Sequence, residues 1–266
     1  MKGVPLQDIF DDIPPISAQS AERLGYPTQK PLALLERIIA SSTDKRSIVL
    51  DPFCGCGTTI DAAQKLGCKW IGIDVTHIAT NLIKFRLKNR HHLKEGVDYR
   101  VLGEPKDLSS AKELASQDRY QFEWWALGLV EATPYQDKKK GADTGVDGIC
   151  YFQDGKKVTD LKSIVDQVKS GNVSVKDIRE LNTVVDNKKA ATGILITLRP
   201  PTKPMMTEAA SKGFYEYKIT KKRYAKIQIL TIEELLAGKQ IESPPTMPFT
   251  KKAESVGDSH TQGKLI

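Results

Sequence analysis

The sequence predicts two α/β domains joined by a polar segment. Between Ser47 and Asp74 an apolar run, a glycine-rich turn, a helical pattern and a second apolar run follow one another, which is the order of a βαβ unit. From Asp98 to Arg119 the chain turns polar, and after Tyr120 helical and strand patterns resume in an αβββαβ order. We therefore expect an α/β domain over 1–103, a linker over 104–119, a second α/β domain over 120–240 and a disordered tail over 241–266.

Composition places the chain among ordinary soluble proteins. It has 266 residues, of which 39% are hydrophobic and 27% charged, so that each domain can bury a core. The net charge of +7 favours an acidic partner, with nucleic acid first, although such a surplus also serves solubility. The spacing of the four cysteines fits neither a disulfide framework nor a zinc site. Free thiols, together with the lack of a signal peptide or a membrane-length apolar run, predict a cytoplasmic protein without membrane contact.

A glycine-rich turn is the most informative stretch of the first domain. Asp51 to Thr59 reads DPFCGCGTT and lies between the apolar run Ser47–Leu50 and the helical pattern Ile60–Leu66. Glycine lets the backbone bend sharply and lets a ligand approach closely, and the free N–H groups at the start of a helix attract anions. The pattern predicts a strand, a turn and a helix with room for a ligand at the turn.

The second strand of this unit ends at an acidic residue. It runs over Trp70–Ile73 and is followed by Asp74. An acidic side chain about 20 positions after the glycines, at the end of the next strand, usually holds the hydroxyl pair of a ribose. We therefore expect a nucleoside-bearing cofactor across the unit, whereas the glycines taken alone would fit a plain tight turn equally well.

The stretch Gly25–Pro31, GYPTQKP, precedes the turn and makes the pattern specific. Together the two stretches resemble the S-adenosylmethionine-binding part of DNA amino-methyltransferases, which methylate the exocyclic nitrogen of adenine or cytosine. The resemblance runs from about Pro5 to about His92 and implies a partial class I, Rossmann-like methyltransferase fold with Asp74 at the ribose. The other cofactor-binding positions that it implies are Thr28, Lys30, Asp51, Phe53, Gly55 and Gly57.

The segment Asp11–Ile16, DDIPPI, differs from the catalytic Asp-Pro-Pro-Tyr of that family. Ile13 separates the aspartate from the prolines and Ile16 replaces the aromatic ring that stacks on a flipped base. The segment is more similar to the aspartate-isoleucine-proline-proline that precedes the cofactor motif. In this branch of the family the catalytic loop lies N-terminal to the cofactor motifs. We therefore expect a C-terminal piece of a methyltransferase that holds much of the cofactor pocket and lacks the methyl-transfer machinery.

Two further helices are expected in the first domain. Pro31–Ala40 starts with proline, which suits a first helical position. The second helix, His77–Leu93, has one apolar face and one basic face that ends in the pair His91 and His92. A solvated helix face explains the basic residues, and DNA contact is the alternative. No zinc partner for the two histidines is visible.

The second domain is expected to build a hairpin with polar residues on one face. A helix over Tyr120–Ala132 carries Glu123, and strands over Ile149–Phe152 and Ser163–Ser170 flank the turn signal Asp154-Gly155. Side chains two apart on a strand point the same way, so Gln167 and Lys169 share a face and can meet Asp147 across the hairpin. The helix Val175–Lys189 and the strand Gly193–Leu198 complete the order.

This arrangement, over about Tyr120 to Gly238, resembles the restriction-endonuclease fold of PD-(D/E)xK nucleases, most closely the Mrr-like branch with Q-x-K. The resemblance implies that Asp147 and Gln167 bind Mg²⁺ and that Lys169 is catalytic, with Glu123 as an outer metal ligand or water-holding residue. Such a metal activates water and neutralises the phosphate, and a lysine stabilises the developing charge. Gln167 removes one negative charge from the usual set, and Asp143 is expected to shape the turn instead of binding metal. A degenerate DNA-binding module is the alternative.

The remaining segments are expected to be a rigid loop, two helices and a strand. The loop is Arg199–Met206, RPPTKPMM, and a basic cluster follows it that suits phosphate contact or solvation equally. Thr231 and Glu234 form a capping box for a last helix that ends near Gly238. The other expected elements and the cluster are the helix Thr207–Gly213, the strand Ile227–Leu230, and Lys218, Lys221, Lys222, Arg223 and Lys226.

The two resemblances together point to DNA modification and restriction. The first expectation is a site-specific, S-adenosylmethionine-dependent DNA methyltransferase of a restriction-modification system, acting on double-stranded DNA, without its catalytic half and with a nuclease-like domain. A magnesium-dependent endonuclease of Mrr-like type is one alternative, and a DNA-binding module without catalysis is another. The recognition sequence, the base that is methylated and the oligomeric state stay open.

Overall fold

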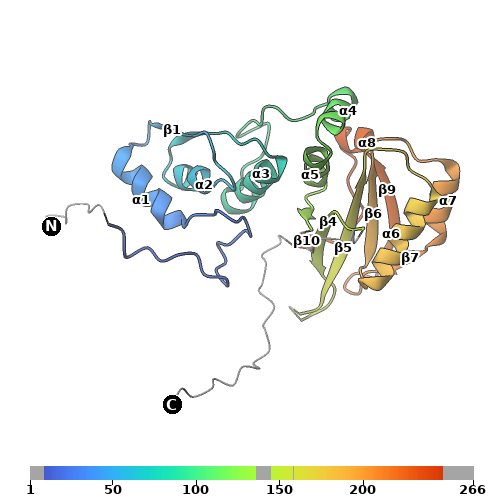
Figure 1. Ribbon diagram of the computed structural model, residues 1–266. Coiled ribbons are helices and arrows are strands. Elements are labelled where there is room, and N and C mark those ends of the chain that lie inside the picture. The colour runs from blue at the N-terminus through green and yellow to red at the C-terminus, as the bar shows by residue number, and fades with distance from the viewer. Residues whose placement is uncertain (1–8, 136–144, 158, 248–266) are drawn as a thin grey trace, which may run out of the picture.

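The computed structural model describes residues 9–135, 145–157 and 159–247, which fold into a small α/β part and a larger one (Figure 1). The smaller part comprises α1 (Leu32–Ser42), β1 (Ile48–Asp51), α2 (Thr58–Lys65), β2 (Lys69–Gly72) and α3 (His77–His91). Each begins and ends within two residues of its expected position, and Pro31 is the residue before α1 instead of its first residue. None of the helices in the described ranges is long and apolar enough to cross a membrane.

In the smaller part β1 and β2 form a parallel pair, with Val49 opposite Trp70 and Asp51 opposite Gly72. One face of this pair packs on α1 and α2, where Ile39, Ala62 and Ala63 are buried against Val49 and Trp70. The βαβ unit expected from the sequence is therefore present, and the glycine-rich turn between β1 and α2 lies at the carboxyl ends of both strands.

The larger part is built on a six-stranded mixed sheet with strand order β10-β4-β5-β6-β9, in which β3 also pairs with β4. β4 and β5 are antiparallel, and β5, β6 and β9 run parallel to one another. Helix α5 (Arg119–Leu129) precedes the strands and α6 (Val175–Asn187) connects β5 to β6, which gives the expected αβββαβ order. The strands are β3 (Thr133–Pro134), β4 (Gly148–Gln153), β5 (Leu161–Lys169), β6 (Thr192–Thr197), β9 (Ile227–Thr231) and β10 (Thr246–Met247).

Helices cover both faces of this sheet (Figure 1). On one face Phe122 and Trp125 of α5 pack with Ile164 and Ile196, and α4 (Leu108–Gln117) and α8 (Ile232–Leu236) add to the same cluster. On the other face α6 and α7 (Lys203–Ser211) bury a second cluster against the sheet. Because both faces are covered, the strands carry nearly continuous apolar sequence, as in β6, where all six residues are buried.

The structure corrects three expectations in the larger part. Helix α7 begins at Lys203, inside the stretch predicted as a rigid loop, because proline is tolerated in the first turn of a helix. The Asp154-Gly155 turn is wider than expected: the N–H of Asp154 bonds to the carbonyl of Asp160. Residues 246–247, placed in the disordered tail, form β10 on the free edge of β4, a long-range pairing that composition does not reveal.

The segment expected as a linker, 104–119, contributes to the second core. Its helix α4 carries Ala111, which is fully buried in the cluster beneath α5. The antiparallel hairpin of β7 (Phe214–Glu216) and β8 (Arg223–Ala225) was not predicted from the sequence, which indicated only a basic cluster there.

Helices α3 and α5 join the two parts. The side-chain amide of Asn81 donates to the carbonyl oxygen of Trp124 at 2.6 Å, and the N–H of His77 donates to the side-chain oxygen of Gln121 at 2.9 Å. Gly128 permits this close approach, because a Cβ at this position would lie 2.3 Å from Oδ1 of Asn81.

Candidate functional site

The first candidate site is the turn between β1 and α2. Asp51 ends β1, and its two carboxylate oxygens accept hydrogen bonds from the N–H of Phe53 at 3.0 Å and from the hydroxyl of Thr59 at 2.6 Å. The side chain thereby ties the start of the turn to the first turn of α2. Asp51, predicted to bind the cofactor, has a clear structural role here.

Asp74 ties the far end of the turn to the second strand. One of its oxygens accepts from the N–H of Gly55 at 3.0 Å, and the other accepts from the N–H and the hydroxyl of Thr76 at 2.9 and 2.8 Å. An ionised carboxylate offers about four acceptor positions, so capacity for a further hydrogen bond remains. The structure therefore brings Asp74 and the glycine turn together, as the sequence predicts, while its ribose contact stays a prediction.

The two glycines need their positions for different reasons. Gly55 has φ of +50° and lies under the ring of Tyr26, since a Cβ there would be 3.1 Å from Cε1 of that ring. Gly57 has φ of +73°, and its Cβ would lie 2.6 Å from Cγ1 of Ile83 on α3. The stretch that contains Tyr26 therefore lies directly beside the turn, although nearly thirty residues separate the two in the chain.

Around the turn, several side chains are open to solvent. Phe53 is 87% exposed and Val75, just past β2, is 89% exposed. Thr28 and Lys30 are also exposed, whereas Gln29 between them accepts from the N–H of Leu24 at 2.8 Å and shapes the loop. Open α/β sheets bind ligands in the crevice outside the carboxyl ends of their strands. The glycine turn and these exposed apolar side chains lie at that end of β1 and β2.

Burial, and secondarily the acidic residues at the strand ends, raises the pKa of groups beside the turn. Burial, together with the nearby Asp74 carboxylate, raises the pKa of the Cys54 thiol to about 11. Burial and the same carboxylate raise the pKa of the Tyr26 phenol. Cys54 is therefore a neutral packing residue at pH 7. The four cysteines are free and buried.

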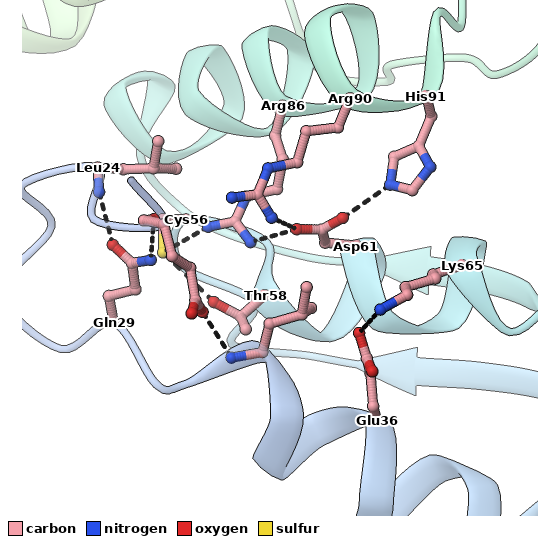
Figure 2. Close-up of polar contacts among 12 residues, drawn as sticks. Leu24, Gln29, Glu36, Cys56, Thr58, Asp61, Lys65, Arg86, Arg90 and His91 are labelled. Carbon is pink, nitrogen blue, oxygen red and sulfur yellow. Dashed lines mark hydrogen bonds and ion pairs between the residues drawn. The ribbon is translucent and has the colours of Figure 1, made fainter. Parts of the chain in front are cut away.

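Beneath the turn lies an ion cluster that sequence reasoning missed (Figure 2). Asp61 of α2 accepts from Arg86 and Arg90 of α3 at 2.8 Å each, and Nε2 of His91 lies 2.7 Å from its other oxygen. Arg86 and Asp61 are buried, and Arg86 also lies 3.8 Å from the sulfur of Cys56. The basic face expected to be solvated is thus partly used to hold α3 against α2. In the sequence, the only indication of this cluster was the presence of three basic residues on α3 and one acidic residue on a short helix.

The second candidate site is the start of β4 beside β5. The N–H of Asp147 donates to the carbonyl of Asp166 at 2.9 Å, and its carboxylate accepts from the N–H of Val168 at 2.8 Å. Gln167 between them is buried, and Lys169 is half-exposed near the end of the strand. The structure thus brings Asp147 against the Gln167–Lys169 stretch, as the hairpin argument predicts. Glu123 is buried on α5, and Asp143 lies outside the described residues.

Asp166, which the sequence reading did not single out, is fully buried in the strand. Neither of its carboxylate oxygens has a hydrogen-bond partner among the described residues. Burial, and secondarily the charge of Asp147, raises its pKa to about 8. The sequence could have indicated this burial, because Asp166 lies two positions from the apolar residues Ile164 and Val168, whose side chains face the core.

The residues at this site fit Mg²⁺ poorly. Mg²⁺ prefers carboxylate oxygens in near-octahedral geometry, but the predicted pair offers one carboxylate and one amide. Oε1 of Gln167 is buried without a partner in the described part of the chain, yet one amide oxygen adds no charge. Among the described residues, no group of three His, Cys, Asp or Glu side chains could hold a metal ion.

The structure separates two basic regions of the larger part. In the cluster around the β7–β8 hairpin, acidic side chains lie within 3.4 Å of Lys218, Lys221 and Lys226, and Lys222 and Arg223 lie over aromatic rings. After the carboxyl end of β6, by contrast, Arg199 and Lys203 are exposed, and the N–H of Leu198 donates to the carbonyl of Lys169 at the end of β5.

Comparisons with known proteins relate the two parts of the chain to two kinds of protein. Residues 1–85 match a family model described as DNA methylase. Residues 122–237 match one described as NACHT-associated inactive Restriction Endonuclease 1. The chain therefore carries an N-terminal segment of DNA methylase type and a restriction-endonuclease-like domain. Both resemblances drawn from the sequence are confirmed at this level, while the Mrr-like type stays a prediction.

Particular relatives support the first assignment over part of their length. The type II methyltransferase M.BamHI of Bacillus amyloliquefaciens is 42% identical over 89 residues, which are 34% of this chain and 20% of that protein. M2.LlaDCHI of Lactococcus lactis subsp. cremoris is 50% identical over 62 residues, or 23% of each chain. The DNA adenine methyltransferase YhdJ of Escherichia coli is 47% identical over 64 residues, or 24% of this chain and 22% of its own. The match to a solved structure, the MspJI restriction endonuclease in complex with a 27-mer oligonucleotide, covers 59% of this chain and 39% of that one, with a TM-score of 0.36 and 16% identity. The chain spans about a fifth to a quarter of the length of these methyltransferases.

Proposed function

We propose that this chain belongs to the DNA-modifying side of a restriction-modification system, with its first part binding S-adenosylmethionine and its second part binding double-stranded DNA. The methylase-type segment and the type II relatives support the first half of this proposal. The bound cofactor would supply an activated methyl group for an exocyclic amino group of adenine or cytosine. The finer assignment of residues rests on the geometry of the turn.

A single observation carries the cofactor proposal. Asp51 and Asp74, at the ends of neighbouring parallel strands, hold one glycine turn between them, and Tyr26 packs over that turn at Gly55. The backbone is thereby fixed in an open, left-handed form, with the exposed ring of Phe53 at its rim. A preformed turn needs little ordering when a ligand binds.

The residues fit the cofactor in distinct roles. Phe53 offers an apolar surface, and Thr28 and Lys30 offer a hydroxyl and a cation on the exposed side of the neighbouring loop. Asp74 has remaining acceptor capacity for a ribose hydroxyl, while Gly55 and Gly57 let the ligand approach the backbone. Asp51 acts by holding the turn.

Calorimetry with the full chain tests this proposal. We expect weak but saturable binding of S-adenosylmethionine, and a roughly tenfold loss in Phe53→Ala, because an exposed ring that covers a ligand contributes on the order of 1–2 kcal/mol. Val97→Ala is the matched control, since Val97 is an exposed apolar residue, 81% accessible, on the loop that follows α3. Absent binding, or equal losses in both variants, would contradict the proposal.

We infer that the second part binds DNA without cutting it. The poor set of metal ligands at Asp147 and Gln167 supports this, as does the inactive description of the matching family. Phosphate contact is assigned to Lys169 at the end of β5 and to Arg199 and Lys203 after β6, in preference to the hairpin cluster, whose lysines lie beside acids.

A salt series of fluorescence anisotropy measurements distinguishes the two basic regions. Arg199→Ala should weaken binding to a duplex and lower the slope of log affinity against log salt by about 1, as one lost phosphate contact does. Lys221→Ala, which removes an exposed lysine paired with Glu216, is the matched control and should change neither quantity. If Lys221→Ala lowers the affinity and the salt slope more than Arg199→Ala does, the DNA contacts the hairpin cluster instead. Cleavage of the duplex in Mg²⁺ that chelator stops would establish the nuclease alternative.

A further inference from the structure

A cavity lies between α3 and the end of α5, at the junction of the two parts of the chain. Its volume is about 740 Å³, and the loop after α3 and strand β3 complete its walls. The two helices are neighbours in Figure 1. The cavity is separate from both candidate sites, because neither the glycine turn, residues 51–59, nor the Asp147 stretch of the larger part lines it.

The walls of this cavity are mainly apolar. Ile78, Leu82 and Phe85 of α3 follow one another at spacings of four and three residues, which places them on one face of the helix. Trp125 and Leu129 of α5 line the other side. Aromatic rings attract one another in offset and edge-on arrangements, beyond what burial of their area contributes. Walls that include Phe85 and Trp125 therefore suit a flat aromatic molecule.

The size and the place of the cavity are those of a ligand site. Protein interiors hold few voids larger than a water molecule, whereas ligand sites measure roughly 300–1,000 Å³ and occur preferentially where domains meet. Asn81 and Gly128, which lie against each other, form part of the wall, and Asn81 also donates to the carbonyl of Trp124 at 2.6 Å. This contact holds the two helices in place, so the cavity is preformed.

The charges around the cavity favour an anion. Its two acidic residues are already paired, since Lys84 lies 3.0 Å from Glu95 and Lys88 lies 2.5 Å from Glu131. Lys94, on the loop after α3, is exposed and forms no ion pair with any residue that the structure describes. An acidic ligand meets a free ammonium group here, whereas a cationic ligand competes with two lysines for the acids.

We propose that this cavity binds a small aromatic anion, whose ring fills the space between α3 and α5 and whose carboxylate or similar acidic group pairs with Lys94. The bound molecule contacts both parts of the chain and therefore stabilises their junction, because a ligand of the folded state alone raises its stability. This second ligand site rests on neither cofactor binding nor DNA binding.

Three probes that share a naphthalene ring and differ in charge test the proposal on the full chain. They are naphthoate, the uncharged naphthalenemethanol and the cationic naphthylmethylammonium. Titrations followed by NMR give the affinity of each probe and the backbone amides that respond. We expect naphthoate to bind most tightly and the ammonium probe most weakly, with shift changes at the amides of α3 and α5.

Two pairs of variants locate the ring and the acidic group. Lys94→Ala should weaken naphthoate about twofold to fivefold, as the loss of an exposed ion pair does, and leave naphthalenemethanol unchanged. Lys112→Ala, at an exposed lysine of α4 outside the cavity, is its control. Leu82→Trp should weaken every probe by about tenfold or more, because the indole takes the place of the ring. Its control is Leu161→Trp, on β5 and 45% exposed.

Each other outcome overturns the inference. No binding of naphthoate, or equal binding of the three probes, contradicts a site for an aromatic anion. Unchanged affinities in Leu82→Trp would place the ring elsewhere, and Leu129→Trp replaces this variant if circular dichroism shows that it unfolds. Displacement of naphthoate by S-adenosylmethionine would show that the cavity is not a separate site. Cofactor binding without naphthoate binding refutes this inference alone and leaves the cofactor proposal standing.

Discussion

Removing Asp61 should loosen the contact between α2 and α3 that supports the glycine turn. The carboxylate of Asp61 is the ion-pair partner of Arg86, and both side chains are only 2% exposed (Figure 2). In Asp61→Ala the guanidinium of Arg86 stays buried and keeps one described neighbour of note, the sulfur of Cys56 at 3.8 Å. A buried charge that loses its partner is costly, because it has been removed from water without compensation.

The size of the effect follows from burial. Breaking a buried pair by removing one partner costs about 3–5 kcal/mol. The pair between Arg90 and the same carboxylate differs, since Arg90 is 34% exposed, and removing an exposed partner costs about 1 kcal/mol or less. The double variant Asp61→Ala with Arg86→Met should be more stable than Asp61→Ala, because methionine removes the unpaired charge and keeps apolar volume.

Native-state hydrogen exchange of the full chain measures this effect locally. A loss of about 3 kcal/mol speeds exchange through local opening by roughly 100-fold, since each 1.4 kcal/mol is tenfold. The change should appear at amides of α2 and α3 and should leave α6, in the larger part, at its original rate. Arg90→Ala is the matched control. If Arg90→Ala and Asp61→Ala have equal effects, or if the double variant is no more stable than Asp61→Ala, the buried pair does not hold the two helices as described.

Three further outcomes follow from particular residues. Gly57→Ala should unfold the smaller part or shift α3, because the new methyl would meet Ile83 at 2.6 Å in a left-handed backbone; a circular dichroism melt that matches the parent refutes this. Asp166, whose pKa is raised to about 8, holds a proton in the folded state that the unfolded chain loses near pH 4, so stability should fall as pH rises from about 4 to about 8. In Asp166→Asn that decline in urea midpoint should flatten, and an unchanged slope would show that Asp166 is not the titrating group. Gln167→Glu adds a second carboxylate beside Asp147, so Mn²⁺ affinity by calorimetry should rise above that of the parent, and no gain would show that Gln167 does not face a metal position.

The sequence predicted which helices and strands form better than where each of them begins and ends. The glycine turn, its flanking strands and the αβββαβ order are determined by local patterns of apolar spacing and glycine, and each appears in the structure. Asp147 was placed against the Gln167–Lys169 stretch by the alternation of side chains along β5, and the structure has this contact. The start of α7 was missed because the three prolines of RPPTKPMM suggested a loop, although proline is compatible with a first helical turn.

Long-range contacts account for what the sequence did not reveal. The pairing of β10 with β4, and the ion pairs of Asp61 with residues some 25 to 30 positions away, depend on how the elements pack. The hydrogen bond from the N–H of Gly55 to Asp74 is another long-range contact that the sequence did not reveal. The sequence predicted Asp74 as a ribose partner, and the structure shows that it also holds the glycine turn.

Photo-crosslinking of radiolabelled S-adenosylmethionine to the full chain tests the central claim most directly. Ultraviolet light attaches a bound cofactor to residues in contact with it, and peptide mapping then locates the label. The cofactor proposal predicts label in the peptide that contains Phe53 to Gly57 or in the one that contains Thr28 and Lys30, with loss of the label when unlabelled cofactor is in excess. Label that resists this competition, or that maps to the sheet of the larger part, would contradict a cofactor site at the glycine turn.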